Sequence, residues 1–268
     1  MTQAENSEWR RKATARTAAP FRGALGVHPA GSLVVTQTVG RLEDGRVVTF
    51  DAPSPVALAL GAARDSCARA EALRVQLGFT KSKAHPFRGI ELLHVEPATV
   101  VFDFLSSYMA TVIFSFAALE YFANEVMERH SNTLIQLSTQ SRARRGTKRR
   151  TKTIKLSAKS LERKPTDEKL SVILPQLLEC PSPKGLNLWA RYVQLRRLRN
   201  DVIHLKGQGV NPKVTSPNAI DTESPLLKFF SIDPSGHVAT SVDMVGHFSG
   251  HIPWGQFDWL ESFQLDPK

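Results

Sequence analysis

The most apolar part of the chain is "FDFLSSYMATVIFSFAALEYFANEV", residues 102–126. The run continues into polar residues without a break in helical character, which is typical of a long buried helix. Ser106, Ser107 and Ser115 interrupt it and Asp103 lies near its start, so a continuous apolar span of about 20 residues is not reached. We therefore expect the central helix of a globular protein here, with no membrane helix.

Composition and charge narrow the class of protein and of partner. The 268 residues, 41% hydrophobic and 22% charged, fit one large or two small globular domains. Lys and Arg exceed Asp and Glu by 35 to 25, giving a net charge of +10. This excess favours an anionic partner: a nucleic acid, an acidic protein or a membrane surface. Cys67 and Cys180 lie far apart, as expected of reduced thiols in a cytoplasmic protein.

The chain is expected to be mainly α-helical and to be organised in consecutive segments. The N-terminal segment lacks the apolar region of a secretory signal, and we expect it to be flexible. The predicted segments are a basic tail at 1–30, a β-hairpin plus helix region at 31–96, a helical core at 97–207 with a basic loop at 141–165, and an irregular C-terminal extension at 208–268 that packs on the core.

Individual elements follow from local patterns. Strand-like residues alternate around Asp44-Gly45, which predicts a hairpin over 32–52. Ser54 before Pro55 is a favourable helix start, and Thr166 or Asp167 is the expected cap of a later helix. Helices are predicted at 54–77, about 98–137, 166–179, 185–207 and 239–249, with a short segment at about 224–231.

The segment "SRARRGTKRRTK", residues 141–152, is too basic for any core, since seven of its twelve residues are cationic. It can attract a polyanion such as RNA without conferring sequence preference. A disordered charged loop or a localisation signal is the alternative. The cationic residues are Arg142, Arg144, Arg145, Lys148, Arg149, Arg150 and Lys152.

The helix that contains "RRLRNDVIHLKG", residues 196–207, has two dissimilar sides. At 100° per residue, Arg197, Asn200 and His204 fall within roughly 60° of one another, on a side that the core does not need. Arg199 lies about 140° from His204 on the same wheel. The apolar positions predict a core face made of Leu195, Leu198, Val202 and Leu205.

Two interpretations of the polar side remain open. The arginines can form a solvated face, with Asp201 paired to one of them and His204 packed at a helix end, where the helix dipole favours a cation. Alternatively, the arginines, Asn200 and His204 together hold an anion.

The stretch "RNDVIH", Arg199 to His204, resembles the Arg-x(4 to 6)-His signature of HEPN domains, which often have a polar residue such as Asn200 after the arginine. These are all-helical modules whose best-studied members are metal-independent endoribonucleases. The earlier stretch "SFAALEYFANEVMERH", residues 115–130, also resembles the core helix of the family, including the acidic Glu120. The resemblance covers residues from about 100 to 207.

The resemblance implies a HEPN-like helical bundle, a homodimer in which the motif-bearing helices face each other, and metal-independent cleavage of RNA. His204 is then the candidate acid or base, since histidine is the only side chain of the motif that titrates near neutral pH. Arg199 would clamp the phosphate and Arg197 would be a second cation. Asn200 would orient the phosphate or ribose, and Glu120 would order the motif arginine.

Several functions are compatible with these features. The first is a ribonuclease acting as the toxic effector of a toxin–antitoxin or antiviral defence system, with an antitoxin or defence protein as a further partner. The second is a catalytically inactive scaffold that binds nucleic acid or a protein. A third is a regulatory protein with a recognition domain at 1–96. No metal or cofactor is expected, because His247 and His251 lack a carboxylate or cysteine to complete a ligand set.

Overall fold

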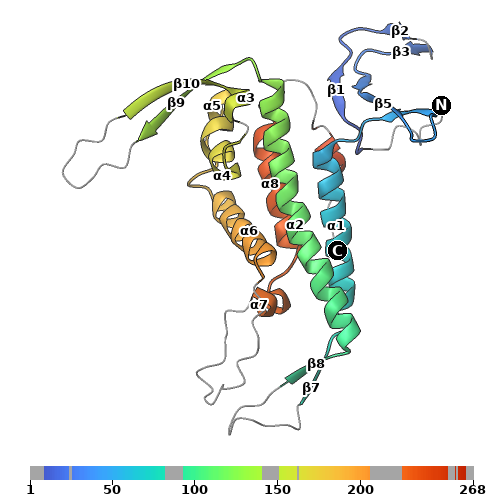
Figure 1. The fold of residues 1–268 in the computed structure, drawn as a ribbon, viewed down its shortest axis with the longest axis vertical. Coiled ribbons are helices and arrows are strands. Elements are labelled where there is room, and N and C mark those ends of the chain that lie inside the picture. The colour runs from blue at the N-terminus through green and yellow to red at the C-terminus, as the bar shows by residue number, and fades with distance from the viewer. Residues whose placement is uncertain are drawn as a thin grey trace. The chain divides into compact units, whose positions relative to one another are not determined.

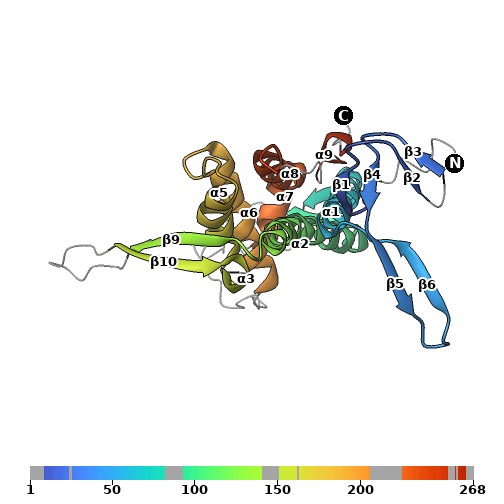
Figure 2. The same cartoon turned by 90° about the horizontal axis from the view of Figure 1, so that it is seen from above.

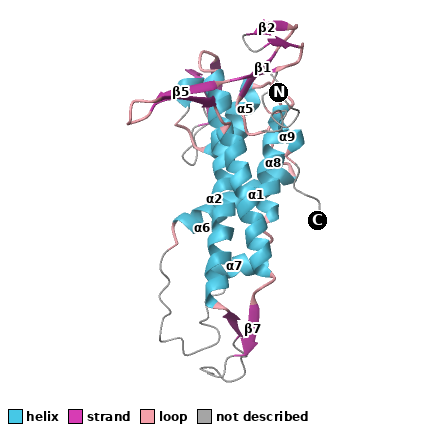
Figure 3. Ribbon diagram, turned by 90° about the vertical axis from the view of Figure 1, so that its right-hand side faces the viewer, coloured by secondary structure: helices cyan, strands magenta, loops and turns pink. Residues whose placement is uncertain are grey.

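The computed structural model of the protein is mainly helical, with short two-stranded sheets (Figure 3). The mainly α-helical class predicted from the sequence is therefore confirmed. The structure describes residues 9–23, 26–81, 93–140, 151–161, 163–205, 225–252, 257 and 259–263.

The chain forms two compact units, and each is assembled from separated stretches of sequence. Unit 1 comprises Met1–Leu58, Ala118–Trp189 and Asp243–Lys268, and unit 2 comprises Ala59–Ala117 and Ala190–Val242. Several long helices contribute residues to both units. The units consequently do not coincide with the consecutive segments predicted from composition.

The N-terminal part of unit 1 consists of antiparallel strand pairs. They are β1 (Ala13–Arg16) with β4 (Leu33–Val35), β2 (Phe21–Gly23) with β3 (Gly26–His28), and β5 (Gln37–Arg41) with β6 (Val47–Asp51). β1, β2 and β3 lie within residues 1–30, so the segment predicted as a flexible tail contains paired strands that the prediction did not include. Lys12 N donates to Ala52 O at 2.7 Å, and Thr36 N donates to Lys12 O at 3.1 Å. Such pairing depends on distant residues, so tail composition could not reveal it.

The predicted hairpin around Asp44-Gly45 is present as β5 and β6, which lie side by side in Figure 2. Gly45 has a φ of 87°, a conformation that L residues rarely adopt. Asp44 accepts a hydrogen bond from Arg46 N at 3.0 Å. The Arg46 side chain beside Asp44 also lowers the pKa of that carboxyl group. Turn chemistry thus identified this element correctly.

Helix α1 (Pro55–Arg74) begins where Ser54 and Pro55 predicted. The Ser54 Oγ accepts a hydrogen bond from Ala57 N at 3.3 Å and so caps the first turn. Leu60 and Ala63 are fully buried, as expected for the apolar side of the helix. A short antiparallel pair in unit 2, β7 (Gly78–Lys81) with β8 (Leu93–Glu96), follows it.

The long apolar stretch forms helix α2 (Ala98–Arg129), which ends about eight residues before the predicted limit at Leu137. β9 (Leu134–Gln140) follows and pairs antiparallel with β10 (Thr151–Ser157), as Figure 1 shows. The helix α3 (Ala158–Leu161) comes directly after β10. The region predicted as a basic loop over 141–165 therefore contains a strand and a short helix as well.

By length and composition, α2 does meet the requirement for a membrane-crossing helix, although its serines argued against this. Within the fold, 39% of its most apolar 18-residue window is buried. Phe104, Tyr108 and Val112 are fully buried on the part of α2 in unit 2. Ser107 and Ser115 are buried among them, so these serines belong to the packed side of the helix.

The helix predicted over 166–179 is divided into α4 (Thr166–Glu168), a π-helical segment η2 (Lys169–Ile173) and α5 (Leu174–Leu177). Neither Thr166 nor Asp167 is the cap, since Pro165 occupies that position without a side-chain hydrogen bond. Pro175 explains part of the irregularity, because proline has no N–H to donate to the carbonyl four residues earlier. The Ser182 Oγ donates to that carbonyl, on Ser171, at 2.7 Å.

The remaining helices are α6 (Asn187–Ile203), α7 (Pro225–Ser231), α8 (Ser235–Ser249) and α9 (Trp259–Ser262). The C-terminal extension is thus largely helical in its described part, and the prediction of an irregular extension was wrong. In unit 2, Phe229 of α7 stacks on Tyr108 with ring centroids 4.5 Å apart. In unit 1, the ring centroid of Phe122 lies 6.0 Å from that of Phe248 of α8 and 5.0 Å from that of Phe257. Aromatic packing therefore ties these late segments to the core of each unit.

Candidate functional site

The inner face of α6 is apolar, as its spacing predicted. Leu195, Leu198 and Val202 are buried, and Tyr192, which the pattern did not single out, is fully buried with them. Leu205 was predicted to join this face and does not, because the helix ends at Ile203 and Leu205 remains 36% exposed. The predicted end of this helix, at residue 207, lies outside the described residues. The inner face fixes which side of α6 reaches solvent.

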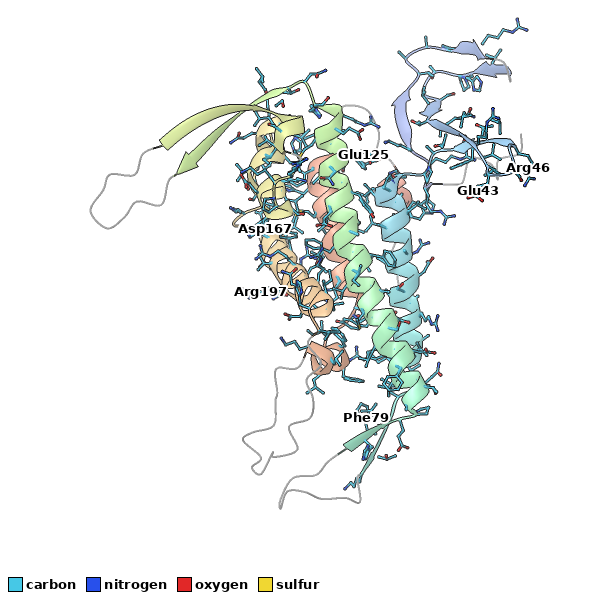
Figure 4. All side chains as sticks on the ribbon, in the orientation of Figure 1. Glu43, Arg46, Phe79, Glu125, Asp167 and Arg197 are labelled. Carbon is cyan, nitrogen blue, oxygen red and sulfur yellow. The ribbon has the colours of Figure 1, made fainter. Side chains whose placement is uncertain are left out.

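The outer face of α6 carries the three polar residues that were predicted to share it. Arg197, Asn200 and His204 are all exposed, and Figure 4 labels Arg197 on this helix. His204 N donates to Asn200 O at 2.9 Å, so His204 closes the last helical turn. An exposed guanidinium, an amide and an imidazole on one face can hold an anion and transfer a proton.

Arg199 lies on the border between the two faces and is half-buried. Its guanidinium carbon is 5.1 Å from the centroid of the Phe116 ring of α2. Its Nη1 donates to the Asn200 Oδ1 at 3.2 Å. Phe116 in turn stacks on Tyr192, with ring centroids 6.1 Å apart and planes 17° apart. The structure therefore brings Arg199 and Asn200 together, both within unit 2.

Asp201 forms a different ion pair from the one that the solvated-face interpretation predicted. It was expected to pair with a neighbouring arginine of its own helix, whereas its carboxylate lies 4.0 Å from the Lys228 ammonium of α7. The two side chains are 42% and 44% exposed, so water screens the pair and its contribution to stability is small. The ion pair of Asp201 therefore joins α6 to α7 within unit 2.

Glu120 belongs to unit 1 and is half-buried. It accepts a hydrogen bond from the Thr166 hydroxyl at 3.3 Å, next to a contact of 2.5 Å between Lys169 Nζ and Asn124 Oδ1. Glu120 and Asn124 are one turn apart on α2, so both contact the same segment. The expectation that Glu120 orders the motif arginine stays a prediction.

The predicted RNA-attracting run lies almost entirely outside the described residues. Its members Arg142, Arg144, Arg145, Lys148, Arg149 and Arg150 are all in that category. Lys152 is placed by its backbone on β10, where it pairs with Thr139 of β9. The role of this run as an attractor for nucleic acid stays a prediction.

A buried polar pair in unit 2 was not predicted. Tyr108 OH and His237 Nε2 are 3.0 Å apart, and the two side chains are 0% and 8% exposed. Burial lowers the pKa of His237 from 6.5 to about 4, against an opposing effect of Asp233. Burial likewise raises the pKa of the Tyr108 phenol. The imidazole that hydrogen-bonds to Tyr108 is therefore neutral.

The histidines considered as metal ligands have other surroundings. The His247 Nε2 lies 2.9 Å from the carbonyl oxygen of Pro181, and His251 is exposed after the end of α8. Within the described part of the chain, no three His, Cys, Asp or Glu side chains are grouped as a metal site requires. Comparison of the chain with family models, curated proteins and solved structures gave no significant match.

Proposed function

We propose that the protein is a HEPN-type, metal-independent endoribonuclease that uses the outer face of α6. The observation that supports this proposal is the exposure of Arg197, Asn200 and His204 on one helical face, with Arg199 hydrogen-bonded to Asn200. Cleavage of a phosphodiester needs a cationic and a neutral hydrogen-bond donor, together with a group that exchanges protons. This face offers all three.

The reaction is a transesterification within RNA. A base removes the proton of the 2′-hydroxyl, the 2′-oxygen attacks the adjacent phosphorus, and the 5′-oxygen leaves as an acid protonates it. The products end in a 2′,3′-cyclic phosphate and a 5′-hydroxyl. His204 performs one of the two proton transfers. The second acid or base comes from the facing copy of α6 in a homodimer.

The wider setting follows from charge and from the resemblance. A net charge of +10, with a strongly basic run at 141–152, favours RNA as the anionic partner. We propose that the protein acts in the cytoplasm as the toxic effector of a toxin–antitoxin or antiviral defence system. An antitoxin or another defence protein then restrains its activity.

A second candidate is a catalytically inactive scaffold that binds nucleic acid or a protein. The position of Arg199 favours it, because a guanidinium held over Phe116 is partly withdrawn from the solvent that a substrate would occupy. In a scaffold, the outer face of α6 contributes binding only. Charge reversal in the run at 141–152 is then the most damaging change.

The test is incubation of wild type and His204→Ala with total RNA and with a structured RNA, in EDTA. We expect wild type to cleave and the variant to lose about 100- to 10,000-fold in rate, the usual contribution of acid–base catalysis. End-group analysis should find 2′,3′-cyclic phosphates. His251→Ala removes another exposed histidine and is the matched control.

Equal activity of His204→Ala and wild type would contradict the proposed role of His204. Absence of cleavage by a folded wild-type protein that still binds RNA would favour the scaffold.

A further inference from the structure

The guanidinium of Arg199 is engaged on two sides before any substrate arrives. Its carbon lies 5.1 Å from the Phe116 ring centroid, within the range of a cation–π interaction. Its Nη1 also donates to the Asn200 Oδ1 at 3.2 Å. The first contact restrains the position of the guanidinium and the second restrains its direction. The Arg199 side chain is accordingly half-buried and does not extend into solvent.

The ring beneath Arg199 is itself fixed by the core of unit 2. Phe116 is only 4% exposed, and its ring is nearly parallel to that of the fully buried Tyr192, at 17°. Arg199 and Tyr192 both belong to α6, so the helix contacts Phe116 through a packed ring as well as through a cation. The surface that holds the guanidinium is therefore rigid.

The hydrogen bond from Arg199 decides what Asn200 can offer to a ligand. A side-chain amide has an oxygen that accepts and a nitrogen with two N–H groups that donate. Because Arg199 donates to the oxygen, the amide nitrogen of the exposed Asn200 is the group left to donate to an incoming ligand. A phosphate oxygen, which only accepts hydrogen bonds, is the ligand group that suits that nitrogen.

We propose that Phe116 and Arg199 are positioning residues: the ring holds the guanidinium, which fixes the Asn200 amide so that it donates to a phosphate oxygen of RNA. The exposed Arg197 is then the cation that contacts the phosphate directly. This inference rests on the proposed function and reverses the roles that the motif alone gave to the two arginines.

The first test is a double-mutant cycle of Arg199→Ala and Asn200→Ala, measured as kcat/KM for RNA cleavage in EDTA. Loss of one hydrogen bond to a charged group lowers kcat/KM by about 10- to 100-fold. We expect the double variant to lose no more than the worse single variant, because both changes remove the same contact. Losses that multiply would mean that Arg199 contacts the substrate itself and would overturn the proposal.

Phe116 is tested with a conservative and a disruptive substitution. Phe116→Leu removes the π face and should lower kcat/KM as much as Arg199→Ala does. Phe116→Tyr keeps the π face and should retain most of the wild-type kcat/KM. Tyr192→Leu disturbs the same stacked pair but leaves the ring beneath Arg199, so it is the control for packing. If Tyr192→Leu lowered kcat/KM as much as Phe116→Leu does, and these two variants had equal melting temperatures, the result would show that Phe116 acts only through packing.

A measurement independent of cleavage separates this inference from the proposed function. In an NMR spectrum, the Phe116 ring current should shift the Arg199 Nε proton upfield in wild type and in Phe116→Tyr, and not in Phe116→Leu. The shift together with absence of cleavage would refute the nuclease while supporting the positioning contact. Absence of the shift in wild type would overturn the positioning contact whether or not RNA is cleaved.

Discussion

Two histidines of unit 2 have opposite surroundings. His237 on α8 is 8% exposed and hydrogen-bonded to Tyr108, and burial lowers its pKa to about 4. His204 closes the last turn of α6 through its backbone hydrogen bond to Asn200 and is exposed. The first is held neutral inside the fold, and the second lies where a solute can reach it.

The difference teaches that the fold, and not the residue type, decides what an imidazole can do. A buried imidazole loses the hydration that stabilises its cation, so it stays neutral and serves as a fixed hydrogen-bonding partner. An exposed imidazole keeps access to water and to ligands. We therefore expect changes at His237 to affect stability and changes at His204 to affect activity.

The largest expected effect on stability is its dependence on pH through His237. Between pH 6.5 and about 4 the unfolded chain binds a proton at this histidine and the folded protein does not, so stability falls as pH falls. The full loss, reached below about pH 4, is about 3 kcal/mol. Urea unfolding of wild type and His237→Gln across this range measures the effect. The free energy of unfolding of wild type, relative to that of the variant, should fall by that amount as the pH falls.

His237→Gln keeps a hydrogen-bonding partner for Tyr108 and cannot titrate, so other groups contribute equally to both proteins. A difference that stays constant with pH would refute the lowered pKa of His237.

Removing the tyrosine hydroxyl should have a smaller effect. Tyr108→Phe leaves the buried His237 Nε2 without its hydrogen-bond partner while the stacking on Phe229 is kept. A buried polar group left unsatisfied costs about 1–3 kcal/mol, measurable by urea unfolding. Tyr121→Phe is the control, because Tyr121 is 47% exposed. Equal stability of the two variants would mean that the Tyr108–His237 hydrogen bond contributes nothing.

The smallest effect is expected at the exposed histidine. His204→Ala should change the free energy of unfolding by no more than about 0.5 kcal/mol, since an exposed side chain away from the core contributes little. Thermal unfolding of the variant measures this. A loss as large as that of Tyr108→Phe would show that His204 is a structural residue, like His237.

Local patterns predicted the elements whose causes are local. Ser54-Pro55 gave the start of α1, and Asp44-Gly45 gave the turn between β5 and β6. The apolar run predicted α2, but its end at Arg129 was missed, because the strand pairing of the residues that follow involves partners beyond 150. The division of 166–177 around a π-helical segment was also missed, although Pro175 was the available signal.

For the candidate site, the sequence by itself determined the two faces of α6. The 3.6-residue period places Leu195, Leu198 and Val202 inward and Arg197, Asn200 and His204 outward. It failed only for Leu205, which lies beyond the end of the helix at Ile203.

Only the tertiary structure decided which side chains meet across helices. The contact of Arg199 with Phe116 and the pairing of Tyr108 with His237 join residues far apart in the chain. A periodic pattern specifies a direction around one helix axis, whereas a contact also requires the position of a second helix. Packing of the α2, α6 and α8 segments within unit 2 supplies that position. It makes one histidine a buried partner of Tyr108 and leaves the other exposed.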